Sequence, residues 1–308
     1  MKIVFMGTPD YAVKTLEALL KTEHEVAAVF AQPDKPVGRK QVLTPPPVKV
    51  CALDNNIPVY QPNSVKDGKA YEILKELNPD VIVVVAYGKI LPKEILNVAK
   101  YGCVNGHASL LPKYRGASPI QWCIVQGETQ TGVTTMLMDE GMDTGDILES
   151  VKVDIGEQET AEELFERLSQ ISAELMVSTI GKLEKGEITP QKQTGEPSYA
   201  PIIKKDMAKL DFNKTATEVH NAVRGYYSWP CAYFMLGGKR VKVISARIGD
   251  NTDKPCGTVI GNTDELVIAC GNGTSIRLLT AQMEGSKAMS AKQMLCGNQI
   301  PLGTVVGE

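Results

Sequence analysis

KIVFMGTPDYAVKTLEALLKTEHEVAAVFA, residues 2–31, opens the chain with two strand-length apolar runs on either side of an amphipathic stretch. The runs are residues 2–6 and 25–31, and the apolar residues between them have helical spacing. Thr8 followed by Pro9 is typical of a helix start, with Thr8 as N-cap and Pro9 as the first helical residue. Strand, helix and strand in this order predict a parallel sheet with a right-handed crossover.

The same alternation continues to residue 189 and predicts a Rossmann-like α/β domain with a mostly parallel sheet. Thr160 and Glu163 match a capping box at the start of a long amphipathic helix. The expected strands are 80–86, 103–105, 132–138 and 147–153, and the expected helices are 66–77, 93–99, 118–127 and 160–185.

A proline-rich segment, QPDKPVGRKQVLTPPP at 32–47, interrupts this alternation. Its five prolines are incompatible with a helix or a central strand. Irregular segments of this length are usually functional or mobile, so we expect a loop of that kind.

The last third of the chain has a different pattern. Residues 190–204 are rich in proline, glycine and polar residues, which indicates a linker between domains at 1–189 and 205–308. A helix at 214–224 then precedes short strands separated by glycine turns, which predicts a small OB-like β-barrel. Residues 205–308 hold twelve Lys and Arg against nine Asp and Glu, and the preceding residues hold 21 against 27, so the barrel is the part suited to a polyanion.

Composition limits the class of protein. With 43% hydrophobic and 22% charged residues, the 308-residue chain is typical of a globular protein of two domains. It has no signal-peptide pattern and no apolar run of the roughly 18–20 residues that span a bilayer. The seven cysteines include no CxxC pair, so neither a disulfide framework nor a zinc ribbon is expected. We expect a cytoplasmic, monomeric enzyme that does not contact membranes.

Asn105 and His107 are the first candidates for chemistry. They lie two apart at the end of an expected strand, where ligands bind in sheets of this class. Alternate residues of a strand point to the same side, so an amide and an imidazole can converge on one atom. The alternative is that His107 is a structural histidine held by a hydrogen bond.

An acidic stretch at 138–146, MDEGMDTGD, follows another expected strand. Its spacing does not match a calcium loop and no second histidine is near, so we expect no metal. For Asp139, Glu140 and Asp146, a solvated or turn-forming role is the simplest interpretation. GTPD at 7–10 lacks the three glycines of a dinucleotide fingerprint, and no Walker A, GxSxG or HExxH pattern occurs.

Two of these segments together, NGHASLLPKYRG (105–116) and MDEGMDTGD (138–146), resemble the folate-dependent formyltransferases. The proline-rich insertion and the barrel narrow the resemblance to the branch that acts on tRNA. Further matching segments extend the resemblance over the whole chain: GTPDYA (7–12), QPDKPVGR (32–39), AYGKILP (86–92) and GYYSWPCAY (225–233).

The resemblance implies formyl transfer from 10-formyltetrahydrofolate to the α-amino group of methionine on initiator methionyl-tRNA, without a metal. It implies a catalytic trio of Asn105, His107 and Asp143. The folate donor is then expected to contact residues of three segments: Tyr87, Gly88, Ile90, Leu91, Ser109, Leu110, Leu111, Pro112 and Asp139. The tRNA is expected to contact basic residues of the insertion and the barrel: Arg39, Lys40, Lys204, Lys205, Lys239 and Arg240.

Other interpretations stay open at this point. A sugar-nucleotide formyltransferase shares the donor and the trio, although a sugar amine needs no basic, proline-rich insertion. A glycinamide ribonucleotide formyltransferase would leave about 100 C-terminal residues unexplained. A non-catalytic RNA-binding protein on the same fold would not need the intact trio.

Overall fold

Val81–Val85 (β6) is a fully buried run of valine and isoleucine inside a seven-stranded sheet. The computed structural model describes residues 1–38, 40–298 and 300–307. These fall into two compact units, one of residues 1–119, 131–153 and 165–200, the other of residues 120–130, 154–164 and 201–308. The seven-stranded sheet belongs to the first unit.

The strands of this sheet follow the order β10-β9-β7-β6-β1-β2-β5. β1 is parallel to β2 and β6, β6 to β7, and β2 to β5, whereas β9 is antiparallel to β7. The parallel part confirms the predicted Rossmann-like sheet. The other bounds are Lys2–Gly7 (β1), Glu25–Phe30 (β2), Val59–Tyr60 (β5), Cys103–His107 (β7), Gln130–Leu137 (β9) and Asp146–Asp154 (β10).

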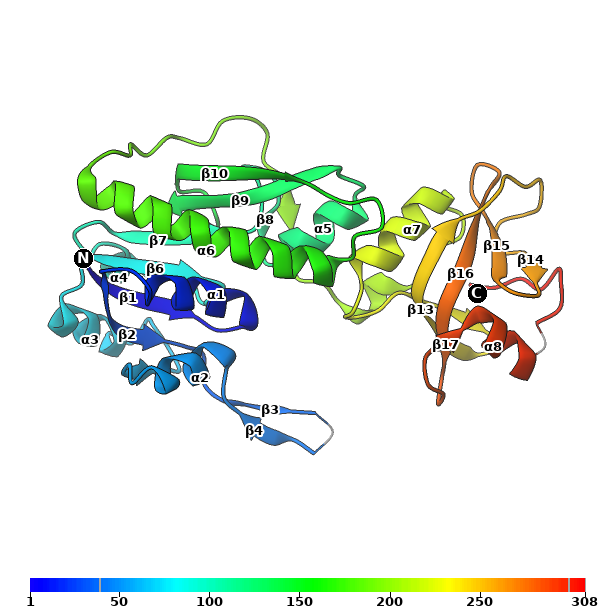
Figure 1. Cartoon of the computed structure of the whole chain (residues 1–308), viewed down its shortest axis with the longest axis horizontal. Helices are drawn as coiled ribbons and strands as arrows, with labels where there is room; N and C mark the ends of the chain where they lie inside the picture. Colours follow the sequence, from blue (N-terminus) through cyan, green and yellow to red (C-terminus); the bar gives the residue numbers. More distant parts are fainter. Residues whose placement is uncertain (39, 299, 308) are drawn as a thin grey trace. The chain divides into compact units, whose positions relative to one another are not determined.

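Helices cover both faces of the sheet (Figure 1), which is why β6 is apolar at every position. Asp10–Leu19 (α1) and Ala161–Lys185 (α6) share one face, where the rings of Tyr11 and Phe165 meet edge to face. Lys69–Leu77 (α3) and Lys93–Leu96 (α4) pack on the other face in one apolar cluster with Val4, Met6 and Ile82. Pro47–Asp54 (α2) is a further helix of this unit, which the sequence pattern did not predict.

Of the two predicted helix starts, the one at Thr160 is confirmed and the one at Thr8 is wrong. Thr160 and Glu163 form the predicted capping box, with Thr160 N donating to Glu163 Oε2 at 2.8 Å and Glu163 N to Thr160 Oγ1 at 3.3 Å. At α1 the prediction was wrong by one residue, because Pro9 is the N-cap. Thr8 instead donates its hydroxyl to the carbonyl of Tyr87 at 3.0 Å, which ties the end of β1 to the end of β6.

The proline-rich segment is a β-hairpin and not the expected irregular loop. Lys35–Val37 (β3) pairs antiparallel with Val42–Thr44 (β4), and the hairpin extends away from the sheet (Figure 1). Gly38 (φ +72°) and Gln41 (φ +50°) have the left-handed backbone that its turn requires. In a two-stranded ribbon each strand has a free edge, so a proline can be accommodated where no amide hydrogen is needed.

The second unit is built on a curled antiparallel sheet of order β12-β13-β16-β15-β14, with β17 beside β16. Its core joins these strands to α7 and α8. This half-barrel confirms the predicted small β-domain. Its bounds are Lys205–Ala208 (η1), Ala216–Gly225 (α7), Tyr233–Leu236 (β12), Lys239–Ile248 (β13), Val259–Asn262 (β14), Leu266–Cys270 (β15), Thr274–Met283 (β16), Met289–Ser290 (β17) and Ala291–Gly297 (α8).

Two segments that precede residue 165, namely 120–130 and 154–164, belong to this second unit. The first holds most of Pro119–Val125 (α5), against which α7 packs so closely that a Cβ on Gly225 would lie 2.6 Å from Val125 Cγ2. In the second segment, Arg224 Nη1 donates to the carbonyls of Gly156 and Glu159 at 3.0 and 3.2 Å. The predicted division at 1–189, 190–204 and 205–308 stays a prediction.

None of the described helices is long and apolar enough to cross a membrane. The expected cytoplasmic location stays a prediction.

Candidate active site

Asn105 and His107 lie at the carboxyl end of β7, between β6 and β9. Both are buried, and alternate strand positions place their side chains on the same face of the sheet. Gly106 between them faces helix α6, where a Cβ would lie 3.1 Å from Ser172 Oγ and 3.3 Å from Met176 Cε. Glycine therefore lets α6 pack closely behind the strand while the amide and imidazole face the opposite side.

The two ring nitrogens of His107 have different surroundings. Nε2 lies 2.9 Å from the carbonyl oxygen of Tyr114, which can only accept, so Nε2 carries a hydrogen. Nδ1 lies 3.7 Å from Asp143 Oδ2, which is beyond hydrogen-bond length but within ion-pair range. The imidazole is thus fixed by a backbone carbonyl, and Nδ1 is the nitrogen left to face the carboxylate.

Asp143 is positioned by a tight loop between β9 and β10. Its Oδ2 accepts a hydrogen bond from Gly116 N at 2.7 Å, and its side chain is 16% exposed. Its backbone is left-handed (φ +54°), which is unusual for a residue with a side chain. The loop has no spare room, because a Cβ on Gly145 would lie 2.0 Å from Leu137 O.

Asn105 differs from the other two residues, because its carboxamide has no hydrogen-bond partner among the described residues. An unengaged amide at the end of a strand can donate to a ligand. The predicted trio is therefore brought together as one amide, one imidazole and one carboxylate, each from or beside the carboxyl end of a strand.

Three further residues that sequence reasoning did not assign support this arrangement. Gln193 bonds to the Asp143 loop and to Arg115, as described below. Thr134, opposite His107 on β9, donates to the carbonyl of Ser109 at 2.7 Å and accepts from Leu111 N at 3.3 Å. Arg115 is part of the segment NGHASLLPKYRG (105–116), but the sequence analysis assigned it no role. No pattern in a single sequence could have indicated Gln193.

Comparisons with known proteins place the chain in a family. The formyl transferase family matches residues 1–180, and the family of the formyl transferase C-terminal domain matches residues 202–299. The methionyl-tRNA formyltransferase of Thermodesulfovibrio yellowstonii is 48% identical over 301 residues, which cover 98% of this chain and 97% of that protein. That of Caldanaerobacter subterraneus subsp. tengcongensis is 46% identical, over 99% of this chain and all of that protein.

The chain belongs to the methionyl-tRNA formyltransferase family.

Solved structures with lower sequence identity to this formyltransferase have the same fold. The methionyl-tRNA formyltransferase from Clostridium thermocellum is 24% identical with a TM-score of 0.57, covering 82% of this chain and 95% of that one. An N-formyltransferase from Helicobacter canadensis, in complex with folinic acid and dTDP-3-aminofucose, is 22% identical with a TM-score of 0.71, covering 90% and 98%. At such identities the likeness concerns the fold.

The residues expected to hold the folate donor divide into two kinds. Tyr87 and Leu91 are buried in the apolar core, and burial raises the pKa of the Tyr87 hydroxyl to about 12. Gly88 and Ile90 are exposed, with 70% of Ile90 accessible. Tyr87 and Leu91 therefore expose almost no surface to a ligand, whereas Ile90 offers an apolar side chain to solvent.

The other expected donor contacts lie in two loops of the formyltransferase. Ser109 donates its hydroxyl to the carbonyl of Lys113 at 2.6 Å, which closes the turn that contains Leu110, Leu111 and Pro112. The carboxylate of Asp139 accepts from Gly141 N at 3.0 Å and from Thr144 Oγ1 at 2.6 Å. Asp139 thus has the turn-forming bonds suggested by the simplest interpretation of the acidic stretch. A donor contact by these residues stays a prediction.

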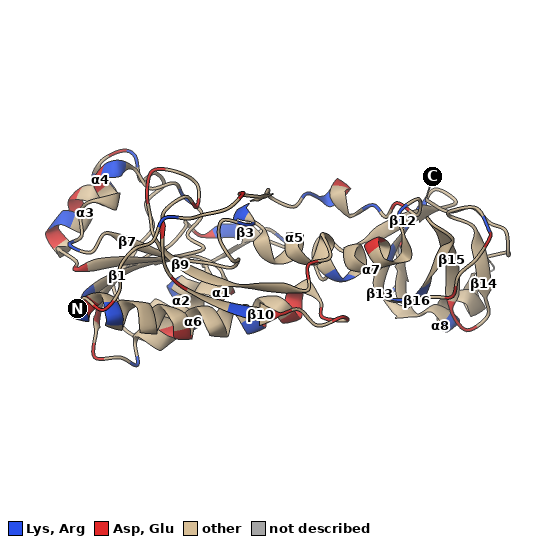
Figure 2. Cartoon of the chain, turned by 90° about the horizontal axis from the view of Figure 1, so that it is seen from above, with Lys and Arg blue, Asp and Glu red and all other residues tan. Residues whose placement is uncertain are grey.

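The basic residues expected to contact tRNA are exposed where the structure describes them. Lys40 lies in the turn of the hairpin, and Arg39 lies outside the described residues. Lys204 and Lys205 begin η1, and Lys239 and Arg240 begin β13 (charges in Figure 2). The Arg240 guanidinium lies 4.3 Å from the centroid of the Tyr233 ring on β12, and the backbone of Lys209 forms a parallel β-bridge with Tyr233.

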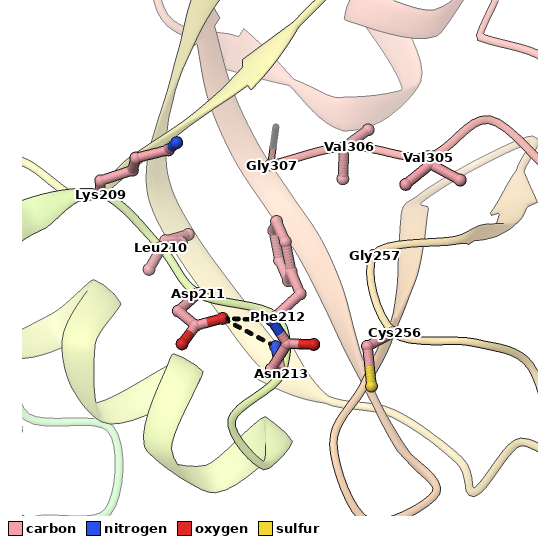
Figure 3. A pocket seen from close by; sticks show the side chains of 10 residues that line it. All are labelled: Lys209, Leu210, Asp211, Phe212, Asn213, Cys256, Gly257, Val305, Val306 and Gly307. Carbon is pink, nitrogen blue, oxygen red and sulfur yellow. Dashed lines mark hydrogen bonds between the residues drawn. The ribbon is translucent and has the colours of Figure 1, made fainter.

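A separate pocket of 380 Å³ lies in the second unit (Figure 3). Lys209, Asp211 and Cys256 are among its lining residues, but none of the trio is. The Asp211 carboxylate is already bonded to the backbone and side chain of Asn213 at 3.0 and 2.9 Å. Within the described residues, no group of three or more His, Cys, Asp or Glu side chains could hold a metal ion. The expectation of a metal-free reaction stays a prediction.

Proposed function

We propose that this formyltransferase moves the formyl group of 10-formyltetrahydrofolate onto the α-amino group of methionine on initiator methionyl-tRNA, with Asn105, His107 and Asp143 as catalytic residues. The observation that carries the assignment of residues is the meeting of an unpartnered amide, an oriented imidazole and a held carboxylate. The full-length relatives named for this activity support the choice of donor and acceptor.

The amine attacks the formyl carbon, so negative charge develops on the formyl oxygen in the transition state. Asn105 is suited to donate an N–H to that oxygen, because its carboxamide is free of other bonds in the described structure and lies on a rigid strand. Donors aimed at developing charge in a site shielded from water are usually the largest single contribution to such catalysis. No electron transfer is needed, since the C–N bond to the acceptor forms and the C–N bond to the folate breaks. The proton that the amine loses balances the proton that the leaving folate nitrogen gains.

His107 supplies the second donor once it is protonated. Tyr114 O occupies Nε2, so the Nδ1–H on the side of Asp143 is the hydrogen left to donate to the formyl oxygen. The carboxylate lies beside Nδ1 and keeps one oxygen bonded to Gly116 N. Asp143 is also placed to accept the amine proton through a water molecule, and a catalytic contact that is 3.7 Å long in the free enzyme can tighten when substrate binds.

For the donor, we propose a pocket formed by Ile90 and Gly88 with the backbone around Tyr87 and Leu91, by the turn of Ser109 to Pro112, and by the backbone at Asp139. An exposed apolar side chain next to glycine suits a flat pterin ring, which needs apolar walls and backbone hydrogen-bonding groups.

For the acceptor, we propose that the hairpin contacts the tRNA through Lys40, and that Arg39, which lies outside the described residues, also contacts it. The stretch 35–53 has four basic residues and no acidic residue. Lys204, Lys205, Lys239 and Arg240 would contact the phosphate backbone from the second unit. We further propose that the enzyme acts as a cytoplasmic monomer.

The assignment is tested by an acceptor assay with 10-formyltetrahydrofolate as donor. Methionine-charged initiator tRNA is offered in one reaction and an amino-sugar nucleotide in another, and tetrahydrofolate release and formylated product are measured. We expect turnover with the tRNA alone. Turnover with the sugar alone would refute the acceptor while leaving the donor and the trio in place.

The same assay tests the trio through His107→Ala, with His24→Ala as control because His24 is the histidine of the first unit outside the site. We expect His107→Ala to lower kcat by about 10²–10³, in the range of a lost donor to the developing oxyanion, with the Kd for tRNA within twofold. A His107→Ala enzyme that turns over like wild type would contradict the catalytic assignment.

A further inference from the structure

We propose that Gln193, held by Arg115, is a positioning residue for formyl transfer that sets the place of the Asp143 carboxylate. The inference rests on the function proposed above. Gln193 lies in the segment that the sequence indicates as a linker, fifty residues after Asp143, and contacts the trio only at the backbone carbonyl of Asp143.

All the hydrogen-bonding capacity of the Gln193 carboxamide is used. Its Nε2 donates to the carbonyl oxygens of Asp143 and Gly145, both at 2.8 Å. Its Oε1 accepts from Arg115 Nη2 at 2.6 Å and from Arg115 Nε at 3.2 Å. The guanidinium fixes the orientation of the amide, because exchanging its oxygen and nitrogen would put donors against donors and acceptors against acceptors.

The loop that Gln193 bonds to is one that needs external support. Asp143 has a left-handed backbone, which is costly for a residue with a Cβ and persists where surroundings impose it. The two Gln193 bonds clamp the carbonyls on either side of Thr144 and so fix this turn. With the turn fixed, the Asp143 carboxylate reaches both Gly116 N and the space beside His107 Nδ1.

Gln193 is itself anchored on both sides along the chain. Gln191 exchanges two backbone hydrogen bonds with Ile147, at 2.7 and 2.8 Å. Tyr199–Ala200 (β11) pairs with Arg115–Gly116 (β8), and Arg115 N donates to Ser198 O at 2.9 Å. The same short strand thus supplies the Arg115 side chain that orients Gln193 and the Gly116 N–H that binds Asp143.

The consequence is a closed loop of contacts from Arg115 through Gln193 to the backbone of Asp143, and from the Asp143 carboxylate back to Gly116. A carboxylate held at two points keeps a single orientation toward His107. Because misplacing a reacting group by about 1 Å can cost 10²-fold in rate, losing this support should lower kcat and not the affinity for either substrate.

The test compares Gln193→Met with Gln191→Ala in the full-length enzyme under saturating folate donor and tRNA. Methionine keeps the length of the side chain and removes all four hydrogen bonds, whereas the exposed Gln191 side chain is two residues away and has no bond in the described structure. We expect Gln193→Met to lower kcat about 10²-fold, with both KM values within threefold of wild type. Gln191→Ala should behave as wild type. A Gln193→Met enzyme with kcat within twofold of wild type overturns the proposal.

A double-variant cycle with Asp143→Asn separates positioning from a general loss of structure. If Gln193 acts through the Asp143 carboxylate, Gln193→Met should cost almost nothing once that carboxylate is gone. Losses that multiply in the double variant, or a fall in kcat that is matched by unfolding at the assay temperature, would mean a merely structural role and overturn the proposal.

A second variant guards against misfolding of the first. Arg115→Lys keeps the charge but cannot present two parallel N–H groups to Gln193, so kcat should fall by a smaller factor of about ten with an unchanged melting temperature. Failure of the proposed function would look different, because wild-type enzyme would then not formylate methionyl-tRNA or Asp143→Asn would keep the wild-type rate.

Discussion

The trio at the end of β7 and the hairpin β3–β4 are opposite kinds of structure within one unit. His107 and Asp143 have side chains that are 7% and 16% exposed, with bonds to residues distant in sequence. In the hairpin, Val37, Val42 and Leu43 are 56%, 59% and 64% exposed, and the strands pair only with each other in the described structure.

The difference matches two different tasks. Chemistry needs groups that are fixed before the substrate arrives, so that no reorganisation is needed in the transition state. Apolar side chains left in solvent at the end of a basic ribbon are suited instead to a surface that a large partner covers. On this view the trio should control kcat and the hairpin should control the affinity for the acceptor.

Of the three variants that test this comparison, Asn105→Ala should have the largest effect, which is a loss of kcat. It tests whether the trio controls kcat. Loss of one oxyanion donor should lower kcat by about 10²–10³, while the Kd for tRNA stays within twofold. Single-turnover formylation and a tRNA-binding assay measure the two separately. Asn97→Ala, at an exposed asparagine after α4, is the control. Weaker tRNA binding with an unchanged kcat would show that Asn105 recognises the tRNA and does not take part in catalysis.

Lys40→Gln should have an intermediate effect, confined to the acceptor. If Lys40 contacts a phosphate, the variant makes about one phosphate contact fewer, so its tRNA affinity depends less steeply on salt. Raising the salt from 50 to 200 mM should then weaken the binding of wild type about threefold more than the binding of the variant. The kcat at saturating tRNA should not change. Lys152→Gln, at an exposed lysine of β10, is the control. Parallel salt dependences for Lys40→Gln and wild type would argue against a phosphate contact.

Lys49→Met should have the smallest effect, which is a change in the rate of proteolysis. It tests which contacts hold the base of the hairpin. Lys49 Nζ bonds to Asp34 Oδ1 at 2.8 Å and to Gln61 Oε1 at 2.8 Å. Without these bonds we expect chymotrypsin to cleave after the exposed Leu43 about twofold faster, since local opening governs such cleavage. Mass spectrometry of the fragments measures this, with Lys66→Met as control. Cleavage that is equally slow in Lys49→Met would show that the base is held by other contacts.

The effect of pH on the contacts at the base of the hairpin follows from the carboxylate of Asp34. Hydrogen bonds from Lys49 and Gln61 lower the pKa of Asp34 below its ordinary value of 3.8. A lowered pKa means that the stabilisation is complete above the ordinary value and disappears as the pH falls through the lowered one. Between pH 5 and 9 the difference in cleavage between Lys49→Met and wild type should therefore be constant.

Local patterns predicted most of the fold because they depend on neighbouring residues. The capping box at Thr160, the buried strand at 81–85 and the half-barrel are each visible as spacing or composition. The hairpin was missed because five prolines argue against regular structure, and the sequence does not show that its strands have free edges. Thr8 was misplaced as a cap because its hydroxyl has a better partner, the carbonyl of Tyr87, 79 residues away.

The candidate site was predictable only in part for the same reason. Asn105 and His107 share a strand, so their convergence follows from the two-residue period. That Asp143 lies beside His107 came from a resemblance, and the 3.7 Å contact joins residues from two strand ends. Gln193 supports Asp143 across fifty residues through bonds to carbonyl groups, which leave no trace in residue type.

The second unit assembles from chain segments that are made at very different times. Residues 120–130 and 154–164 belong to it, yet their packing partner Arg224 and its helix come about sixty residues after the second segment. At the usual synthesis rate of about 5–20 residues per second, these segments wait on the ribosome for about 3–12 s before α7 emerges. The nascent enzyme thus has a stage, lasting seconds, in which its first sheet can form while residues 120–130 and 154–164 still lack the helix α7 that they pack against.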